Sequence, residues 1–158
     1  EAMDAARAGG VIGVGAGGNP PAVGGELATK STKAKGLGGL VVAGGGRDTA
    51  DIRKLEFDVW TRHVTSHAGD PHGHGEINQP IRVGGQAVAP GDWIVADDDG
   101  VMVLPKARAV EMANRAADVL EAENRIRQEI RDGKGTLGQV VNLLRWEKQG
   151  GGRGAITG

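Results

Sequence analysis

The sequence contains no cysteine and few aromatic residues, and its charges nearly cancel. The absence of cysteine excludes disulfides, zinc-thiolate sites and iron–sulfur clusters. A formal net charge of -1, from 19 Lys and Arg against 20 Asp and Glu, creates no field that attracts nucleic acid or anionic lipid. No apolar run approaches the roughly 18 residues of a membrane-spanning helix, and we find no signal-peptide pattern. We therefore expect a cytoplasmic protein that binds neither membranes nor nucleic acid.

Glycine accounts for 29 of the 158 residues, whereas aromatic residues make up only 3%. A chain of this length suits one domain. So much glycine indicates many tight turns and close backbone approaches, and it leaves few large side chains for a core. We therefore expect subunit contacts to complete the packing, and we predict a homo-oligomer.

Helical patterns and short apolar runs alternate in the first half of the chain. We expect the end of a helix at 1–8, a helix at 27–35 that stops at Gly36, and a short helix at 48–55 with Asp48 as its N-cap. The expected strands are 10–14, 40–43 and 57–60, and a long polar loop follows the last of them.

The region from 81 to 104 carries the signals of antiparallel β-structure. Its apolar runs are short, and glycine, proline and aspartate separate them. The expected strands are 81–83, 86–89, 93–96 and 101–104, and the turns between them contain Gly84-Gly85, Pro90-Gly91-Asp92 and Asp98-Asp99-Gly100.

The strongest helical pattern of the chain runs from Lys106 to about Asp132 and ends at Gly133. A short closing helix is expected from Thr136, its possible cap, to Trp146. We predict a single domain over 1–149 and a mobile, glycine-rich tail over 150–158.

Residues 13–18 match the G-x-G-x-x-G pattern of dinucleotide-binding loops, and they follow a predicted strand. A true fingerprint opens a helix, whereas Asn19-Pro20-Pro21 favours an irregular loop here. The acidic residue expected about 20 residues further on is also missing, because Lys30, Lys33 and Lys35 occupy that region. We do not expect a nicotinamide cofactor.

Two other clusters suggest metal sites, and both have simpler interpretations. His63, His67, His72 and His74 crowd one stretch, but its sequence offers no rigid element to hold a coordination shell, so we interpret it as a solvent-exposed loop. The stretch 97–100 lacks the spaced ligands and terminal Glu of a calcium loop, and an Asp-Gly turn between two strands explains it.

Arg47 and Asp48 follow a glycine-rich strand, 39–46, and they combine two useful groups. A guanidinium can bind a carboxylate, and the neighbouring carboxylate can hold a divalent metal. Backbone N–H groups nearby, in the stretch that begins at Gly25, can bind a small acid. The pair therefore indicates a keto-acid site, although a helix cap beside a surface arginine is an equally simple structural explanation.

Gly25-Glu26, followed after twenty residues by Arg47-Asp48, resembles the signature of the RraA-like family, which includes the 4-hydroxy-4-methyl-2-oxoglutarate aldolases. Further similarity lies in 22–27, 36–42, 81–85 and 90–101. The similar blocks keep the family's order and spacing from about Glu1 to Asp132.

The resemblance implies an α/β fold, the swivelling β/β/α domain, with a long C-terminal helix and assembly into trimers or hexamers. It implies Asp48 as the ligand of Mg²⁺ or Mn²⁺, and Arg47 as the group that binds the substrate's carboxylate or keto region. Glu26 would orient water held by the metal. Gly25, Leu27 and Ala28 would complete substrate binding, with the N–H groups of Leu27 and Ala28 receiving the pyruvyl carboxylate at a helix N-terminus.

The implied activity is a retro-aldol cleavage of 4-hydroxy-4-methyl-2-oxoglutarate that releases pyruvate. Cleavage leaves an enolate on the pyruvyl fragment, and a divalent cation stabilises that charge. Water beside the metal and Arg47 would take the hydroxyl proton and return a proton to pyruvate, so no lysine Schiff base is needed. Oxaloacetate decarboxylation follows from the same enolate.

The chain departs from the family pattern in three ways. Ala43 stands where an acidic residue often precedes the glycine of the strand, and Gly13-Val14-Gly15 stands where the first strand often carries another. The family also usually has some sixty or more residues before the part that resembles Glu1 onward, so we expect this chain to lack the family's N-terminal part.

Some family members act by binding and inhibiting an endoribonuclease, and this protein–protein role is the alternative. It does not require Glu26, Arg47 and Asp48 as a set, and the presence of all three favours the enzyme. Methyl transfer to a quinone, a third function given to such sequences, has no support from these residues.

Overall fold

The computed structural model describes residues 2–18, 21–70 and 75–146. These residues form two compact units, one that ends at Ala109 and one that begins at Val110. The single domain expected over 1–149 stays a prediction. The tail expected over 150–158 lies outside the described residues.

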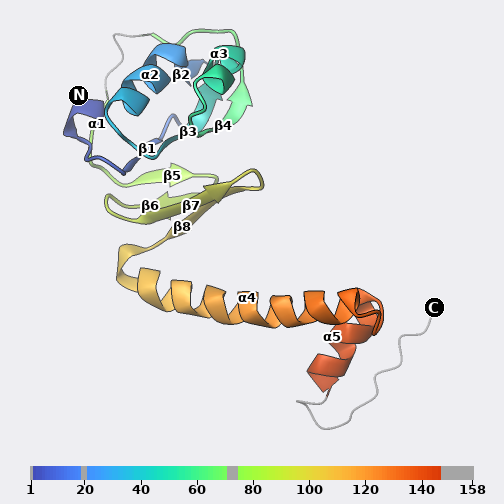
Figure 1. The fold of residues 1–158 in the computed structure, drawn as a ribbon. Helices are drawn as coiled ribbons and strands as arrows, with labels where there is room; N and C mark the ends of the chain where they lie inside the picture. Colours follow the sequence, from blue (N-terminus) through green and yellow to red (C-terminus); the bar gives the residue numbers. More distant parts are fainter. Residues whose placement is uncertain (1, 19–20, 71–74, 147–158) are drawn as a thin grey trace. The chain divides into compact units, whose positions relative to one another are not determined.

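A four-stranded parallel sheet organises the first unit (Figure 1). Its central strand is β3 (Gly39–Gly46), which pairs along one edge with β4 (Val59–Val64). The other edge is shared: β1 (Val11–Val14) pairs with the first half of β3, and β2 (Ala22–Gly24) pairs with its last two residues. Because these pairings are parallel, the carboxyl ends of β2, β3 and β4 lie at the same end of the sheet.

Small residues allow β3 to be buried on both faces. Seven of its eight residues are buried, Ala43 being the exception. A Cβ atom on Gly44 would lie 2.6 Å from the Cβ of Ala16, and one on Gly45 would lie 2.9 Å from the carbonyl oxygen of Pro21. Glycine is required at both positions because adjacent segments of the same chain leave no room for a side chain.

Three helices accompany the sheet: α1 (Ala2–Ala5), α2 (Glu26–Ala34) and α3 (Thr49–Lys54). Both ribbon views show α2 and α3 on the same side of the sheet. Helix α2 packs through Thr29 and Thr32, which are fully buried and whose hydroxyls donate to backbone carbonyls four residues earlier. This bonding satisfies the two hydroxyls without a polar partner from elsewhere. The buried cluster of the unit consists of Ile12, Leu37, Leu40 and Val42.

Two antiparallel hairpins follow, as the sequence predicts. They are formed by β5 (Ile81–Val83) with β6 (Gln86–Val88) and by β7 (Trp93–Asp97) with β8 (Gly100–Leu104). Gly84 and Gly85 both have positive φ, which fits the predicted two-residue turn. The indole nitrogen of Trp60 donates to the carbonyl oxygen of Asp97 at 2.9 Å, which joins β4 to the second hairpin.

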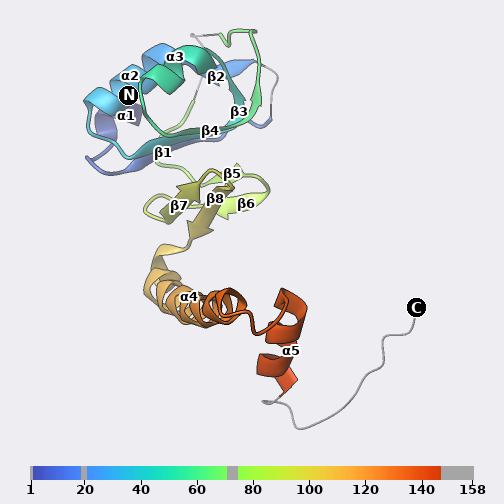
Figure 2. The ribbon, with the colours of Figure 1, turned by 45° about the vertical axis from the view of Figure 1, so that its right-hand side comes forward.

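The second unit consists of the long helix α4 (Ala109–Arg131), whose first residue belongs to the first unit, and α5 (Leu137–Trp146) (Figure 2). Gly133 ends α4 with a positive φ, as predicted. The side chain of Gln139 accepts a hydrogen bond from the backbone N–H of Thr136, which is half of a capping box at the start of α5. No helix among the described residues is long and apolar enough to cross a membrane.

The structure corrects several predicted boundaries. Strand β2 was not predicted, β3 spans the whole glycine-rich stretch 39–46 rather than 40–43 alone, and β4 extends to Val64 although a loop was expected after Trp60. Residues 106–108, predicted as the first turn of the long helix, form a 3₁₀ turn.

Candidate active site

One hollow of about 560 Å³ lies beyond the carboxyl ends of β2 and β3. In parallel sheets, ligands bind at this end of the strands. The first turns of α2 and α3 and the segment 68–69 complete the wall. Every residue that the family resemblance assigns to the site lines this hollow: Gly25, Glu26, Leu27, Ala28, Arg47 and Asp48. The other lining residues are Ala22, Val23, Gly24, Asp51, Ala68 and Gly69.

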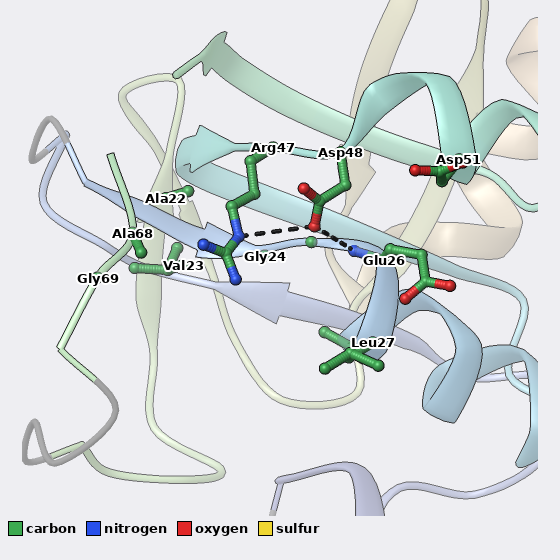
Figure 3. A pocket seen from close by; sticks show the side chains of 12 residues that line it. Ala22, Val23, Gly24, Glu26, Leu27, Arg47, Asp48, Asp51, Ala68 and Gly69 are labelled. Atoms are coloured by element: carbon green, nitrogen blue, oxygen red, sulfur yellow. Dashed lines mark hydrogen bonds and ion pairs between the residues drawn. The ribbon is translucent and has the colours of Figure 1, made fainter. Parts of the chain in front are cut away.

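The carboxylate of Asp48 stands at the centre of the site (Figure 3). Its Oδ2 atom accepts a hydrogen bond from the backbone N–H of Glu26 at 3.1 Å. The same oxygen lies 3.6 Å from Nε of Arg47. Asp48 therefore links the arginine to the N-terminus of α2.

The prediction that Asp48 caps α3 is correct for its position and wrong for its side chain. Asp48 occupies the N-cap position, but its side chain makes no capping hydrogen bond. Its backbone has φ 59° and ψ 34°, in the left-handed region that aspartate tolerates better than most residues. The carboxylate is turned to α2, so this unusual backbone geometry serves the site.

Gly25 leaves the space that this arrangement needs. Its φ of −155° is ordinary extended backbone, so conformational freedom is not the reason for glycine here. A Cβ atom at Gly25 would lie 2.7 Å from Oδ2 of Asp48 and 3.2 Å from Cγ of Arg47. Any side chain at this position would displace the two groups.

The first turn of α2 offers N–H groups to an anion. The N–H of Glu26 is bonded to Asp48, and that of Thr29 is bonded to the carbonyl oxygen of Gly25. Among the described residues, no acceptor faces the N–H groups of Leu27 and Ala28, which belong to the unpaired first turn of a helix. These two donors line the hollow and favour negative charge.

Arg47 contributes the positive side chain of the site. Its backbone N–H donates to the carbonyl oxygen of Gly24 at 3.0 Å, which fixes the residue at the end of β3. The side chain is 43% exposed, so its guanidinium group remains accessible. Figure 3 shows it on the side of Asp48 away from Glu26.

The two other acidic residues of the hollow are held by lysines. Glu26 forms an ion pair with Lys30, one helical turn later, and its carboxylate points away from Arg47 in Figure 3. Asp51 accepts a hydrogen bond from Lys54 at 2.7 Å, and this bond lowers the pKa of the Asp51 carboxyl. The site thus brings together the backbone of Glu26 with Asp48 and Arg47, but not the Glu26 side chain.

The donor set fits a hydrated divalent ion better than a closed metal site. No group of three or more His, Cys, Asp or Glu side chains in the described part of the chain could hold a metal. Asp48 has a second oxygen, Oδ1, that binds no other described residue. Mg²⁺ keeps several waters and commonly uses one or two protein carboxylates together with substrate oxygens. Asp48 therefore meets the requirement for such an ion.

The glycine motif at 13–18 has a structural explanation. It leads to strand β2 and opens no helix. A Cβ atom on Gly13 or on Gly15 would lie 3.0 Å from the side chain of Ile81, so these glycines let β5 pack against β1. The G-x-G pattern is therefore a packing feature.

The described residues of the two remaining candidate clusters do not line the hollow. His63 lies in β4 rather than in the predicted loop, whereas His72 and His74 lie outside the described residues. Asp97 accepts hydrogen bonds from the N–H groups of Asp99 and Gly100, which confirms the predicted turn.

A protein-family comparison decides the family. The model for RraA-like proteins, described as Aldolase/RraA, matches residues 1–103. The chain belongs to the RraA-like family. Its α/β architecture and long C-terminal helix agree with the fold that the resemblance implies.

The relatives of this RraA-like chain include an uncharacterized protein and an aldolase. An uncharacterized protein of Methanocaldococcus jannaschii is 40% identical over 82% of this chain and 62% of its own length. The 4-hydroxy-4-methyl-2-oxoglutarate aldolase of Thermus thermophilus is 36% identical over 53% of this chain and 51% of its own length. The chain thus spans about half to three fifths of these relatives.

A solved structure shows the same fold. Streptomyces coelicolor RraAS2, described as an unusual member of the RNase ES inhibitor RraA protein family, aligns with a TM-score of 0.74 and 30% identity. The alignment covers 81% of this chain and 66% of that one. Both an aldolase and a member of a ribonuclease-inhibitor family are therefore among the proteins that this chain resembles.

Proposed function

We propose that this RraA-like chain is a divalent-metal-dependent lyase that cleaves 4-hydroxy-4-methyl-2-oxoglutarate to pyruvate by retro-aldol chemistry. The same site would decarboxylate oxaloacetate. The observation that carries the proposal is the position of the Asp48 carboxylate between the Arg47 guanidinium and the open first turn of α2. A carboxylate that would hold the metal and two kinds of group that would bind an anion thus line one hollow.

The hollow suits a small keto acid. Its volume of about 560 Å³ falls within the range of about 300–1,000 Å³ that is usual for small-molecule sites. The N–H groups of Leu27 and Ala28 would bind the pyruvyl carboxylate, and Arg47 would hold the keto end of the substrate. Both interactions fix the bond to be cleaved relative to Asp48.

Bond cleavage places negative charge on the pyruvyl fragment. A Mg²⁺ or Mn²⁺ ion held by Asp48 would supply Lewis-acid stabilisation of that charge. Arg47 adds a fixed positive charge beside the same fragment, and the first turn of α2 adds the favourable end of a helix dipole. The chain's own groups therefore stabilise the product side of the cleavage.

The alternative aldolase mechanism uses a lysine that forms a Schiff base with the substrate carbonyl. The described residues that line the hollow include no lysine. Lys30 and Lys54 lie nearby, but each is engaged by a carboxylate. The lining favours metal-assisted chemistry over covalent catalysis.

The proton on the substrate's C4 hydroxyl needs a base. Glu26 is turned to Lys30 and does not face Asp48, so it would act through water or after its ion pair opens. We therefore assign Glu26 an orienting role, and assign the proton transfer to water beside Arg47 and Asp48.

A pyruvate-release assay with Mg²⁺ tests the proposal on both substrates. We expect activity that Asp48→Ala and Arg47→Ala each abolish, because the first removes the proposed metal ligand and the second removes the cation that would hold the keto end of the substrate. Arg53→Ala and Asp98→Ala are the controls, since both residues are absent from the wall of the hollow, and they should retain activity. Unchanged turnover in either site variant contradicts the assignment.

The second candidate function is inhibition of an endoribonuclease, and the likeness to RraAS2 favours it. Such inhibition would act through a protein surface and would not need the carboxylate of Asp48. Adding the wild-type chain and Asp48→Ala to an endoribonuclease assay separates the two functions. Equal inhibition by both proteins, without pyruvate release by the wild type, would replace the lyase with the regulator.

A further inference from the structure

The carboxylate of Asp48 depends on one backbone N–H group for its orientation. Among the described residues, its only hydrogen bond comes from the N–H of Glu26, at 3.1 Å (Figure 3). Nε of Arg47 is further away, at 3.6 Å, and both charged side chains are accessible to water. An ion pair in contact with water contributes little by itself. The position of the Glu26 N–H therefore decides where the carboxylate points.

This N–H group belongs to the peptide unit between Gly25 and Glu26, and Thr29 holds the carbonyl of the same unit. The backbone N–H of Thr29 donates to the carbonyl oxygen of Gly25 at 3.0 Å. The hydroxyl of Thr29 donates to the same oxygen at 2.9 Å. A peptide unit is planar, so its C=O and N–H turn together. Fixing the carbonyl of Gly25 thus fixes the direction of the Glu26 N–H.

The hydroxyl bond matters because Gly25 has little restraint of its own. Glycine has no side chain to limit its backbone, and Gly25 precedes α2 rather than lying inside it. The backbone bond from position 29 would form with almost any residue there, whereas the hydroxyl bond needs threonine or serine. Two donors on one carbonyl also polarise the peptide unit, which makes its N–H a stronger donor to a carboxylate.

Thr32, three residues further along α2, makes the same kind of bond without this consequence. Like Thr29 it is fully buried, and its hydroxyl donates to the carbonyl oxygen of Ala28 at 2.7 Å. The N–H of that peptide unit is the N–H of Thr29, which stays within the helix and donates to Gly25. The two threonines are therefore alike in burial and local bonding, but only the acceptor peptide of Thr29 contacts Asp48.

We propose that Thr29 is a positioning residue of the candidate site, whose buried hydroxyl holds the Gly25–Glu26 peptide unit so that the Glu26 N–H orients the Asp48 carboxylate for the metal. This role rests on the proposed function, in which Asp48 holds the divalent ion. Thr29 does not line the hollow, so it acts through the peptide unit alone. Nothing in the family resemblance assigns a role to this residue.

The expected signature is weaker metal binding with an unchanged reaction in the loaded site. A ligand that is already oriented binds an ion more tightly, because the apparent dissociation constant rises as the competent fraction of the protein falls. Without the hydroxyl of Thr29, the carboxylate of Asp48 is correctly oriented for a smaller fraction of the time. A saturating concentration of metal restores that fraction, so kcat should recover.

Thr29→Val tests this signature, because valine keeps the branched shape and lacks the hydroxyl. Loss of one hydrogen bond corresponds to about a three- to tenfold change in an equilibrium constant. The dissociation constant of Mn²⁺, measured from the electron paramagnetic resonance signal of the free ion, should rise by this factor. The kcat of pyruvate release at saturating Mn²⁺ should stay within about twofold of the wild type.

Two matched variants separate positioning from packing. Thr29→Ser keeps the hydroxyl and removes a buried methyl group, so it should be less stable in urea and yet bind Mn²⁺ as the wild type does. Thr32→Val removes the same kind of bond at the same burial, and it should leave the Mn²⁺ dissociation constant within about twofold. Equal Mn²⁺ constants for Thr29→Val and Thr32→Val, or weak binding by Thr29→Ser, overturns the proposal.

Hydrogen exchange of the Glu26 amide, followed by NMR without metal, tests the same role independently of catalysis. Exchange should be about three- to tenfold faster in Thr29→Val and unchanged in Thr29→Ser and Thr32→Val, with Asp48→Ala giving the rate of the unbonded group. If the wild type released no pyruvate, the lyase function would fail, whereas the exchange rates would still decide the role of Thr29. Unchanged exchange in Thr29→Val shows that the hydroxyl does not hold the peptide unit.

Discussion

Strand β3 of the first unit and helix α4 of the second differ in the interactions that stabilise them. Seven of the eight residues of β3 are buried. At Gly44 and Gly45, adjacent segments of the same chain lie too close to allow a side chain. None of the 23 residues of α4 is buried, and its ion pairs join residues one turn apart. Packing therefore determines the structure around β3, whereas local interactions determine that of α4.

The contrast explains where the candidate site lies. Arg47 and Asp48 follow β3 directly, so their backbone is fixed by the most tightly packed element of the chain. A catalytic geometry needs such rigid support. Helix α4 has no comparable support within the described chain, and it contributes no residue to the hollow.

Truncating a leucine in each unit tests the contrast most strongly. Leu40 is 2% exposed in the cluster beneath the sheet, and Leu40→Ala should lower the free energy of unfolding by about 3 kcal/mol, through lost burial and a residual cavity. Leu137, at the start of α5, is 61% exposed, and Leu137→Ala should change that free energy by less than about 0.5 kcal/mol. Urea denaturation of both variants measures the difference. Similar losses would show that the second unit has an equally demanding core.

Replacing a glycine by alanine in each unit gives the next largest effect, and the change in the free energy of unfolding should have opposite signs in the two units. At Gly45 a new Cβ atom would lie 2.9 Å from Thr65 Cγ2 and 3.0 Å from His63 Nε2, so Gly45→Ala should destabilise the fold by about 2 kcal/mol. At Gly138, in the first turn of α5, nothing lies within 4 Å. Gly138→Ala should therefore stabilise the helix, by about 0.5 kcal/mol. Thermal unfolding of the matched pair measures both signs, and a neutral Gly45→Ala would refute the packing argument for β3.

The sequence was most informative where structure is determined locally. Turn residues placed both hairpins correctly, because Gly84, Gly85 and the 97–100 stretch act within the turns they form. The long helix was equally clear from its periodicity and from the stop at Gly133.

Non-local pairing accounts for the elements that the sequence did not show. Strand β2 has three residues, and it is a strand because β3 lies beside it. The residues of β4 beyond Trp60 include Thr61, Arg62 and His63, whose polarity indicates a loop. Thr61 nevertheless pairs with Val42, and His63 and Val64 pair with the last two glycines of β3. No pattern within either segment reveals these partners.

Some features of the candidate site could be predicted from the sequence, and others depend on contacts between distant residues. Family resemblance indicated six of the twelve residues that line the hollow, but it did not show that Asp48 is turned to α2 or that Gly25 leaves room for it. Two features had a readable signal. Lys30 lies four residues after Glu26, which directly precedes the helix predicted at 27–35, and this spacing favours an ion pair. Asp51 is an acidic residue in the first turn of α3.

A smaller effect on stability is expected at Asp92, and it tests whether burial or membership of the first unit determines the cost of a substitution. Asp92 belongs to the first unit but is held as the surface of α4 is, by polar bonds near solvent. Its carboxylate accepts hydrogen bonds from the N–H groups of Ala89 at 2.8 Å and Lys106 at 2.9 Å. These bonds lower the pKa of Asp92 below its ordinary value of 3.8 in the folded chain.

The sign of the pH dependence follows from this lowered pKa. The bonds stabilise the fold fully above the ordinary value, where the carboxylate is charged in both states, and the benefit is lost as the pH falls through the lower pKa of the folded chain. Asp92→Asn should therefore be slightly less stable than the wild type near pH 7, and the gap should narrow on acidification below about pH 4. Urea denaturation at steps from pH 7 to pH 2.5 measures the gap. A gap as large as that of Leu40→Ala would mean that membership of the first unit matters more than burial, and a gap that widens in acid would contradict the lowered pKa of Asp92.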